Sequence, residues 1–220
     1  MMLLRFAAPF RRTLARTMSS EPSKIRIYTR TGDKGTSALF NGSRCGKDEP
    51  VFRALGDTDE LNANIGVALE HCVVAGNGID EKLAEVQSRL LDAGAAIATP
   101  LSGSSSAKIA RVAFAESHVE QLEQWIDELD ASLPPLRNFI LPSGGLSSAH
   151  LHVARAVCRR AERSIVPLVR DGQVPDVVGR YLNRLSDFLF IAARFASKHD
   201  GKPETVYKKA APEAPEAKAE

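Results

Sequence analysis

Apolar residues recur at spacings of three and four along five long stretches of the chain, residues 52–75, 79–99, 115–131, 145–170 and 176–199. That spacing places them on one face of a helix, whereas the alternation typical of a strand occurs only around Lys24–Thr31. Glycine, serine and proline residues interrupt the pattern between the stretches, as at helix ends and turns. The sequence therefore predicts an all-α protein, a five-helix bundle with a short strand-like segment and a loop at its N-terminus. Such a bundle binds ligands between its helices or on the loops that enter them.

The two ends of the chain differ in composition from this helical body. The first twenty residues contain four arginines and no acidic residue, which is typical of a mitochondrial transit peptide, with a disordered basic tail as the alternative. Residues 210–220 consist only of Ala, Pro, Glu and Lys, so we expect a disordered tail there. The expected organisation is a transit peptide over 1–20, one domain over 21–209 and a tail over 210–220. The expected location is the mitochondrial matrix.

The charge balance limits the partners of the body. The 220 residues carry 29 basic and 27 acidic side chains, for a net charge of +2, and without the first twenty residues that charge is −2. A mildly acidic body lacks the broad basic surface that grips a phosphate backbone, so no nucleic-acid partner is expected. No apolar run approaches the roughly 18 residues of a membrane span, so no membrane association is expected. The three cysteines have no CxxC spacing, which argues against a disulfide framework or a zinc site.

The loop Thr29–Ser37 follows the strand-like segment and contains two glycines three residues apart, Gly32 and Gly35. Such glycines let successive backbone N–H groups turn inward around phosphate oxygens, with the Lys34 ammonium nearby. The P-loop spacing GxxxxGK[ST] is absent and no long helix follows at once, which argues against a P-loop nucleotide fold. The loop therefore predicts a phosphate-binding nest. A glycine–aspartate turn with a solvated lysine is the alternative.

Residues 149–163 place charged side chains beside an apolar stripe. At about 100° per residue, Arg155, Arg159 and Glu162 share one arc next to the stripe, whereas Arg160 points roughly to the opposite side. Charges that lose water at the border of a core must be paired. Glu162 is therefore expected to hold the Arg159 guanidinium in a pose suited to a triphosphate, with a surface ion-pair ladder as the alternative. The stripe consists of Leu151, Ala154, Cys158, Ala161 and Ile165.

The last predicted helix also has two faces. Asn183 and Asp187 lie one turn apart on its polar face, so both can address one ligand or one arginine across a subunit boundary, with a solvated face as the alternative. Upstream, Ser143 is expected to cap the helix that begins near residue 145. The next two glycines are expected to permit close approach by another chain or a ligand, with a tight turn as the alternative. The predicted buried face consists of Tyr181, Leu185, Phe188, Ala192 and Phe195, and Arg180, Arg184 and Arg194 complete the polar face.

Five motifs occur together in an order and spacing that resemble one family. They read TRTGDKGTS, TDEL, FILPSGG, RAVCRRAER and YLNRLSDFLF. From about Ile25 to Lys208 the chain resembles the PduO-type ATP:cob(I)alamin adenosyltransferases, in particular their mitochondrial member. The resemblance implies a five-helix bundle that assembles as a homotrimer with active sites between subunits. It also implies transfer of the 5′-deoxyadenosyl group of ATP to the cobalt of cob(I)alamin, with release of triphosphate.

The resemblance also implies roles for individual residues. Phe139, Arg155 and Asp187 are implied to bind cobalamin, with Phe139 against the lower face of the corrin. Arg155 is further implied to pair with Asp59 across the subunit boundary. The implied catalytic residues are Arg159, Glu162 and Phe139. The implied ATP-binding residues are Thr29, Arg30, Thr31, Gly32, Ser37, Ala38, Lys47, Arg159, Arg160, Ala161, Glu162, Arg163 and Asn183.

The implied chemistry requires no general base. An aromatic wall at Phe139 is expected to exclude the lower base and water, and the resulting four-coordinate cobalt to accept an electron more readily. The phosphate loop, Lys47, Arg159 and Mg²⁺ are expected to stabilise the charge on the leaving triphosphate, while Asn183 and Glu162 position the nucleoside. The Mg²⁺ is expected to be held through the ATP phosphates, with no protein ligand assigned.

The expected small-molecule partners are ATP, Mg²⁺ and cobalamin, as cob(I)alamin or cob(II)alamin. The expected protein partners are a flavoprotein reductase and a methylmalonyl-CoA mutase that receives the adenosylcobalamin. An ATP-gated cobalamin carrier without significant turnover is the alternative function, and the phosphate loop and the expected held Arg159 disfavour it. An ATP-sensing or structural trimer is a further alternative, which would need the loop but not Phe139.

Overall fold

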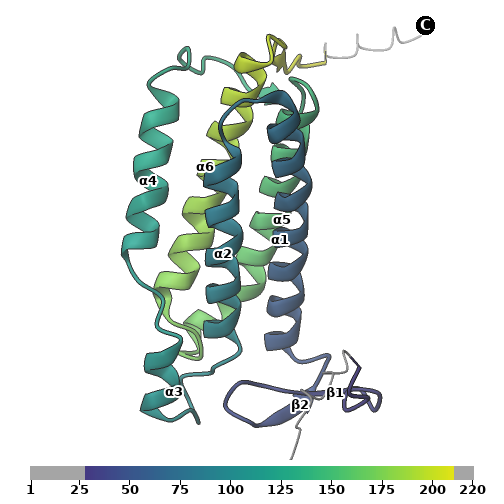
Figure 1. Cartoon of the computed structure of the whole chain (residues 1–220), viewed down its shortest axis with the longest axis vertical. Coiled ribbons are helices and arrows are strands. Elements are labelled where there is room, and N and C mark those ends of the chain that lie inside the picture. Colours follow the sequence, from purple (N-terminus) through teal and green to yellow (C-terminus); the bar gives the residue numbers. More distant parts are fainter. Residues whose placement is uncertain (1–27, 211–220) are drawn as a thin grey trace, which may run out of the picture.

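The computed structural model describes residues 28–210 of the chain. Within that range the chain forms six helices and four short strands (Figure 1). The helices are α1 (Pro50–Ala75), α2 (Asp80–Ile97), α3 (Ser106–Arg111), α4 (Ser117–Asp130), α5 (Leu146–Arg170) and α6 (Asp176–His199). The strands are β1 (Thr36–Ala38), β2 (Arg44–Gly46), β3 (Ile140–Leu141) and β4 (Thr205–Val206).

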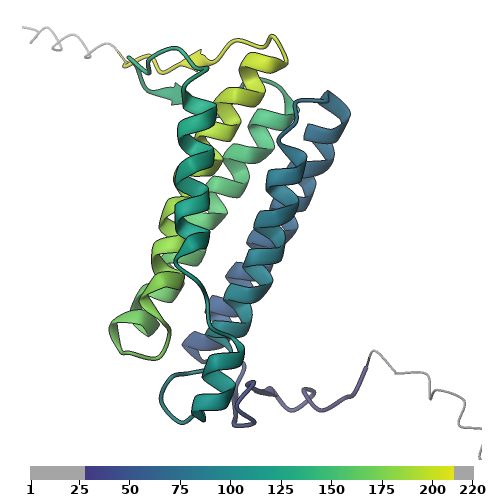
Figure 2. The same cartoon turned by 60° about the vertical axis from the view of Figure 1, so that its left-hand side comes forward.

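The five long helices lie side by side as an elongated bundle (Figures 1 and 2). Helix α5 packs against both α1 and α6, while α2 packs on α1 and α4 packs on α6. All five predicted helices are confirmed, with ends that differ by a few residues from the predicted ones. The short helix α3 was not predicted, because it buries none of its residues and so has no apolar stripe.

The predicted apolar stripes of α5 and α6 form the centre of the core. The stripe of α5 is inaccessible to solvent along its whole length. The Cys158 thiol, which belongs to it, donates to the Leu182 carbonyl oxygen 3.2 Å away, and burial raises the pKa of this thiol. Of the predicted residues on α6, only Phe195 is half-buried, packed against the core. The fully buried ones are Leu151, Ala154, Cys158, Ala161, Ile165, Tyr181, Leu185, Phe188 and Ala192.

One polar residue of α6 departs from the prediction. Arg194 was expected on the polar face, but it is 3% exposed. Its Nε donates to Glu204 Oε1 over 2.9 Å and its Nη2 donates to the Pro134 carbonyl oxygen over 2.9 Å. The chain after α6 folds back over this side of the helix, and helical periodicity alone does not report such a long-range covering.

The predicted strand around Lys24–Thr31 is not formed where the structure can test it. Residues 24–27 lie outside the described range, and Tyr28–Thr31 are not in a strand. The observed strand begins later, at β1, and pairs antiparallel with β2, with Ser37 opposite Cys45. A strand requires a hydrogen-bonded partner, and in this region the segment that finds one is β1 rather than the alternating segment before it.

The prediction that Ser143 caps α5 is wrong. The N-cap residue is Gly145, and no side chain caps this helix. Ser143 Oγ instead donates to the Leu141 carbonyl oxygen and accepts from the Thr205 amide, both over 2.9 Å. It thereby ties β3 to β4, which pair antiparallel. A Cβ added at Gly144 would lie 2.6 Å from Ser197 Cβ, so α6 of the same chain approaches closely at this glycine.

The expectations for the chain ends fall largely outside the described residues. This applies to the transit peptide over 1–20 and to residues 211–220 of the expected tail. None of the helices within residues 28–210 is long and apolar enough to cross a membrane.

Candidate active site

The predicted phosphate loop lies at the end of the bundle where α1 begins, next to β1 and β2 (Figure 1). Arg30 adopts a left-handed backbone conformation with φ of 59°, and Gly35 does so with φ of 74°. The hydroxyl groups of Thr29 and Thr31 are hydrogen-bonded over 2.9 Å. Two left-handed residues and a pair of hydrogen-bonded hydroxyl groups therefore lie within the loop that was predicted to bind phosphate.

Arg44 of β2 holds this loop together. Its Nη2 donates to the Thr31 carbonyl oxygen over 2.7 Å, to the Thr36 carbonyl oxygen over 3.2 Å and to Thr36 Oγ1 over 3.0 Å. Sequence reasoning missed Arg44, because its role depends on the hairpin that places it opposite Ala38. The pairing of β1 with β2 is thus what sets the shape of the loop.

Lys47, which the resemblance implies as a further phosphate partner, lies close to the loop residues. A Cβ added at Gly32 would lie 3.0 Å from Lys47 Nζ, so the ammonium group lies directly over this glycine. The Lys47 amide also donates to the Gly35 carbonyl oxygen over 2.9 Å. The ammonium therefore provides a positive charge beside the turn at Gly32, and a Cβ at that position would require the lysine to shift slightly.

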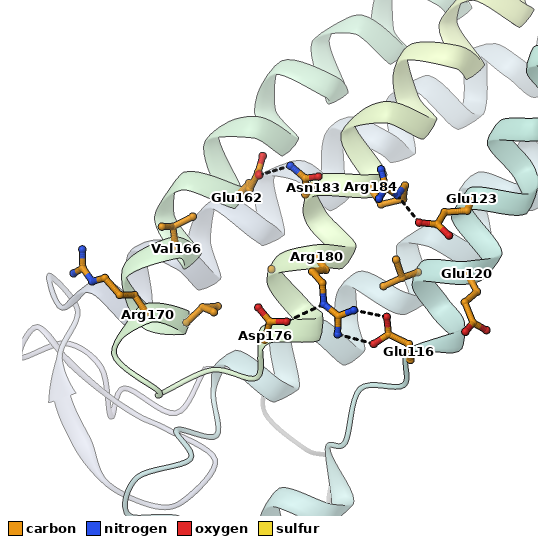
Figure 3. Close-up of a pocket in the computed structure, with 13 residues that line it drawn as sticks. Glu116, Glu120, Glu123, Glu162, Val166, Arg170, Asp176, Arg180, Asn183 and Arg184 are labelled. Carbon is orange, nitrogen blue, oxygen red and sulfur yellow. Dashed lines mark hydrogen bonds and ion pairs between the residues drawn. The ribbon is translucent and has the colours of Figure 1, made fainter.

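A first groove lies between α4, α5 and α6 and contains two of the implied ATP-binding residues (Figure 3). Asn183 Nδ2 of α6 donates to Glu162 Oε1 of α5 over 2.8 Å. The groove has a volume of about 470 Å³, and Val166 and Val169 contribute apolar surface to it. An amide and a carboxylate above an apolar floor suit a nucleoside, which has polar edges and a flat apolar ring.

The expected pairing of Glu162 with Arg159 is not made. Glu162 accepts from Asn183 instead, and within residues 28–210 Arg159 has no hydrogen bond or ion pair to a protein group. The two side chains are one turn apart on α5, but α6 supplies a partner for Glu162. Arg159 is exposed and so retains its full hydrogen-bonding capacity for an anionic ligand.

Two arginines of α6 cross the first groove to α4, as Figure 3 shows. Arg180 forms a bidentate contact with Glu116, at 2.5 and 2.7 Å, and this hydrogen bonding raises the pKa of Arg180. Arg184 Nε donates to Glu123 over 2.9 Å and its Nη1 donates to Asp187 over 3.1 Å. The polar face of α6 is therefore partly covered by α4, which the α6 sequence alone did not indicate.

A second groove, of about 520 Å³, lies beside the first and is lined from α4, β3, α5 and α6. It brings together the three implied cobalamin-binding residues, Phe139, Arg155 and Asp187, with Arg159. Asp187 accepts from Arg184, which lines the first groove, so one ion pair lies between the two grooves. Phe139 is 83% exposed at the rim.

Aromatic and buried polar residues that the sequence did not single out as site residues also line the second groove. The Arg155 guanidinium lies over the Phe190 ring, 5.5 Å from its centroid. His152 is buried, and burial, together with the nearby positive charge of Arg155, lowers its pKa. Ser186 is buried as well. Their polar atoms and the Phe190 ring give the groove a mixed lining that fits a large ligand with an apolar face and polar edges.

The remaining implied residues of α5 face away from both grooves. Arg160 pairs with Glu60 and, over 3.4 Å, with Asp57 of α1, and the hydrogen bond from Arg160 lowers the pKa of Glu60. Ala161 is buried in the core and Arg163 is exposed. Asp59 is exposed on α1, and the described part of the chain gives it no contact with Arg155.

The fold is that of the PduO-type ATP:corrinoid adenosyltransferases. A variant of the Lactobacillus reuteri enzyme, solved in complex with cobalamin and ATP, superposes with a TM-score of 0.76 at 35% sequence identity, over 84% of this chain and 100% of that one. The chain belongs to the cobalamin adenosyltransferase family, whose model matches residues 27–196.

Curated relatives place the chain near the mammalian members of this family. The mouse corrinoid adenosyltransferase MMAB is 51% identical over 87% of this chain and 81% of its own length. The human protein of the same name is 48% identical, over 89% of this chain and 78% of its own length. A corrinoid adenosyltransferase from Mycobacterium leprae is 44% identical over 78% of this chain and 91% of its own length.

Proposed function

We propose that this chain catalyses transfer of the 5′-deoxyadenosyl group of ATP to the cobalt of cob(I)alamin, with release of triphosphate. The observation that best supports this function is the pair of adjoining grooves. One contains Glu162 and Asn183 in hydrogen-bonding contact, and the other contains Phe139, Arg155, Arg159 and Asp187. Two large substrates that react with each other need neighbouring sites of this kind.

In this proposal Arg159 and the phosphate loop stabilise the negative charge of the leaving triphosphate. Triphosphate leaves as a polyanion, so groups that meet it with positive charge and N–H donors stabilise the transition state more than the ground state. Arg159 has no competing carboxylate partner in the described chain, and Lys47 lies over Gly32 in the loop. Glu162 and Asn183, already held together, position the nucleoside without further ordering.

Phe139 contacts the corrin in this proposal. Its exposed ring at the rim of the second groove can lie against the lower face of the macrocycle. There it excludes water and the dimethylbenzimidazole base of cobalamin from the cobalt. Loss of the lower ligand makes reduction of cob(II)alamin easier, because the electron then enters an orbital that no lower ligand raises in energy. The protein therefore acts on the metal by controlling its ligation and its access to water.

We further propose a homotrimer with active sites between subunits. The phosphate loop lies where α1 begins, whereas β3 and Phe139 lie toward the other end of the bundle, where α6 ends (Figure 1). One chain therefore separates the two halves of the site, and a loop from a neighbouring copy is needed to complete it. Asp59 and Arg155, which do not meet within the chain, pair across the subunit boundary in this arrangement.

In this proposal the reaction also involves a metal ion, a cellular compartment and two protein partners. Mg²⁺ accompanies ATP through its phosphates; within residues 28–210, no group of three or more His, Cys, Asp or Glu side chains is arranged to hold a metal ion. Residues 1–20 direct the chain to the mitochondrial matrix, and residues 21–209 form the catalytic domain. A flavoprotein reductase supplies the electron, and a methylmalonyl-CoA mutase receives the product.

The decisive experiment is an adenosylation assay with the purified chain. ATP, Mg²⁺ and chemically reduced cobalamin are incubated anaerobically, and adenosylcobalamin is followed by its absorbance spectrum and its photolability. We expect many turnovers per active site and stoichiometric triphosphate. A chain that binds ATP and cobalamin but forms no product would instead be a cobalamin carrier, and the proposal of catalysis would be wrong.

A further inference from the structure

The position of Phe139 is set by its backbone rather than by its side chain. The ring is 83% exposed, so side-chain packing contributes little to holding it. A ring that must lie against one face of a macrocycle needs a fixed location, since a displacement of about 1 Å already weakens such a site. The contacts of the backbone around Phe139 therefore decide where the ring lies.

The backbone of Phe139 is held by the segment that follows α6. The Tyr207 amide donates to the Phe139 carbonyl oxygen over 2.8 Å. Next to it, β3 pairs with β4, with Ile140 opposite Val206, and Ser143 accepts from the Thr205 amide. A pair of two-residue strands is only marginally stable by itself. The segment that contains β4 must therefore be held by another contact.

Arg194 supplies that contact from within the bundle. Although charged, it is 3% exposed. Its Nε donates to Glu204, directly before β4, and its Nη2 donates to the Pro134 carbonyl oxygen, both over 2.9 Å. Asp130, at the end of α4, lies 3.9 Å from its Nη1. One guanidinium on α6 thus ties together the segment before Phe139 and the segment that pairs with it.

We propose that the Arg194–Glu204 pair is a positioning device for Phe139, acting through β4. This inference rests on the proposed function, because it assigns the pair to the reduction-dependent part of that reaction. A planar guanidinium with two acceptors fixes both of them in one geometry. Loss of Glu204 removes the side-chain contact between α6 and the residue directly before β4, so the partner of the Phe139 backbone is held less firmly. Lys202 stays hydrogen-bonded to Ser197 of α6. The pair contacts neither substrate in this account and is not catalytic.

Two variants test the device at different points. Glu204→Ala removes the partner of Arg194, and Tyr207→Pro removes the amide that donates to Phe139 while leaving the Arg194–Glu204 pair intact. Tyr207→Ala keeps that amide and loses only the ring, so its comparison with Tyr207→Pro isolates the hydrogen bond. Lys209→Pro introduces a proline in the same segment, beyond the paired residues, and is the matched control. Circular dichroism identifies any variant that fails to fold.

The first measurement is independent of activity. Hydrogen exchange is followed in the peptide that covers residues 138–143. We expect faster exchange there in Glu204→Ala and Tyr207→Pro, by about tenfold, and exchange like that of the unmodified chain in Lys209→Pro. Unchanged exchange in both test variants would overturn the proposal, even for a chain without adenosyltransferase activity.

The second measurement tests whether displacing the Phe139 backbone changes the coordination of the cobalt. The four-coordinate fraction of bound cob(II)alamin is measured by electron paramagnetic resonance with saturating ATP. We expect both test variants to lower this fraction and to slow adenosylation from cob(II)alamin about tenfold, with the KM for ATP unchanged and a smaller loss from pre-reduced cob(I)alamin. Equal losses from both cobalamin states would overturn the positioning role in favour of general stabilisation. Absence of product from the unmodified chain would count against the proposed function, while the exchange data would still decide the positioning role.

Discussion

Asn183 Nδ2 donates to Glu162 Oε1 over 2.8 Å, so an amide of α6 and a carboxylate of α5 are joined in the first groove. The carboxylate that was expected to hold Arg159 therefore has another partner. As a result, Arg159 lines the second groove with no protein group bound to its guanidinium within residues 28–210. The Glu162 carboxylate is therefore paired within the chain, whereas the Arg159 guanidinium is available to a ligand.

Arg159→Ala is expected to impair the use of ATP without unfolding the chain. Arg159 is exposed and lies beside the apolar stripe rather than within it, so its removal leaves no cavity. Loss of a charged contact to the triphosphate is expected to cost about 2 kcal/mol, or roughly thirtyfold in kcat/KM for ATP. Steady-state kinetics and thermal unfolding measure the two effects. A folded variant with normal ATP kinetics would remove Arg159 from the site.

Arg44→Ala is expected to weaken ATP binding through the shape of the phosphate loop. The guanidinium donates to two backbone carbonyl oxygens and one hydroxyl group of the loop, and its loss is expected to cost about 1 to 2 kcal/mol of ATP binding. Isothermal titration with ATP measures this loss, and cobalamin binding should not change. Lys34→Ala removes a charge from the same loop without removing these ties. If both variants lose the same affinity, Arg44 acts through its charge alone.

Phe139→Ala is expected to impair the reduction of cobalt more than the transfer of the adenosyl group. Opening the lower face of the corrin allows the dimethylbenzimidazole base or water to return to cobalt, so the four-coordinate population falls. We expect a sharp loss when the reaction starts from cob(II)alamin with a biological reductant, a smaller loss from pre-reduced cobalamin, and little change in ATP affinity. Equal losses in the two assays would make Phe139 an ordinary packing residue.

Arg155→Trp is expected to weaken the trimer and to lower activity. In the proposed assembly this change leaves Asp59 of the neighbouring copy unpaired and places a bulky ring at a subunit contact. The cost is expected to be about 3 kcal/mol or more per contact. Analytical ultracentrifugation over a range of concentrations measures the dissociation. An unchanged trimer with full activity would exclude the Asp59–Arg155 pairing.

The stability of the fold is expected to fall in mild acid because of His152. Burial, with the nearby Arg155, lowers the pKa of His152 from its usual value of 6.5 in the folded chain. The unfolded chain then binds a proton that the folded chain does not, so the free energy of unfolding decreases as the pH falls below about 6.5. Above that pH both states are neutral and the effect is absent. Urea unfolding of the unmodified chain and of His152→Gln measures it, and the variant should lose less stability on acidification. Equal acid sensitivity would assign the effect to other groups.

The five long helices and the family could be predicted from the sequence alone. Helical periodicity is a local property, because residues three and four apart lie on one face whatever packs against it. The stripe from Leu151 to Ile165 was therefore predicted correctly, and of the five α6 residues predicted to be buried only Phe195 is half-buried. The motifs that carry the resemblance are runs of consecutive residues, and they too can be recognised without knowing the fold.

Which polar groups meet could be learned only from the folded chain. Ser143 binds the Thr205 amide instead of capping α5, Glu162 binds Asn183 instead of Arg159, and Arg194 is buried under the segment that contains Glu204. In each case the partner lies at least ten residues away along the chain, outside the turn or helix in which the first residue stands. A hydrogen bond depends on the distance between two groups in space, and local periodicity carries no information about that distance.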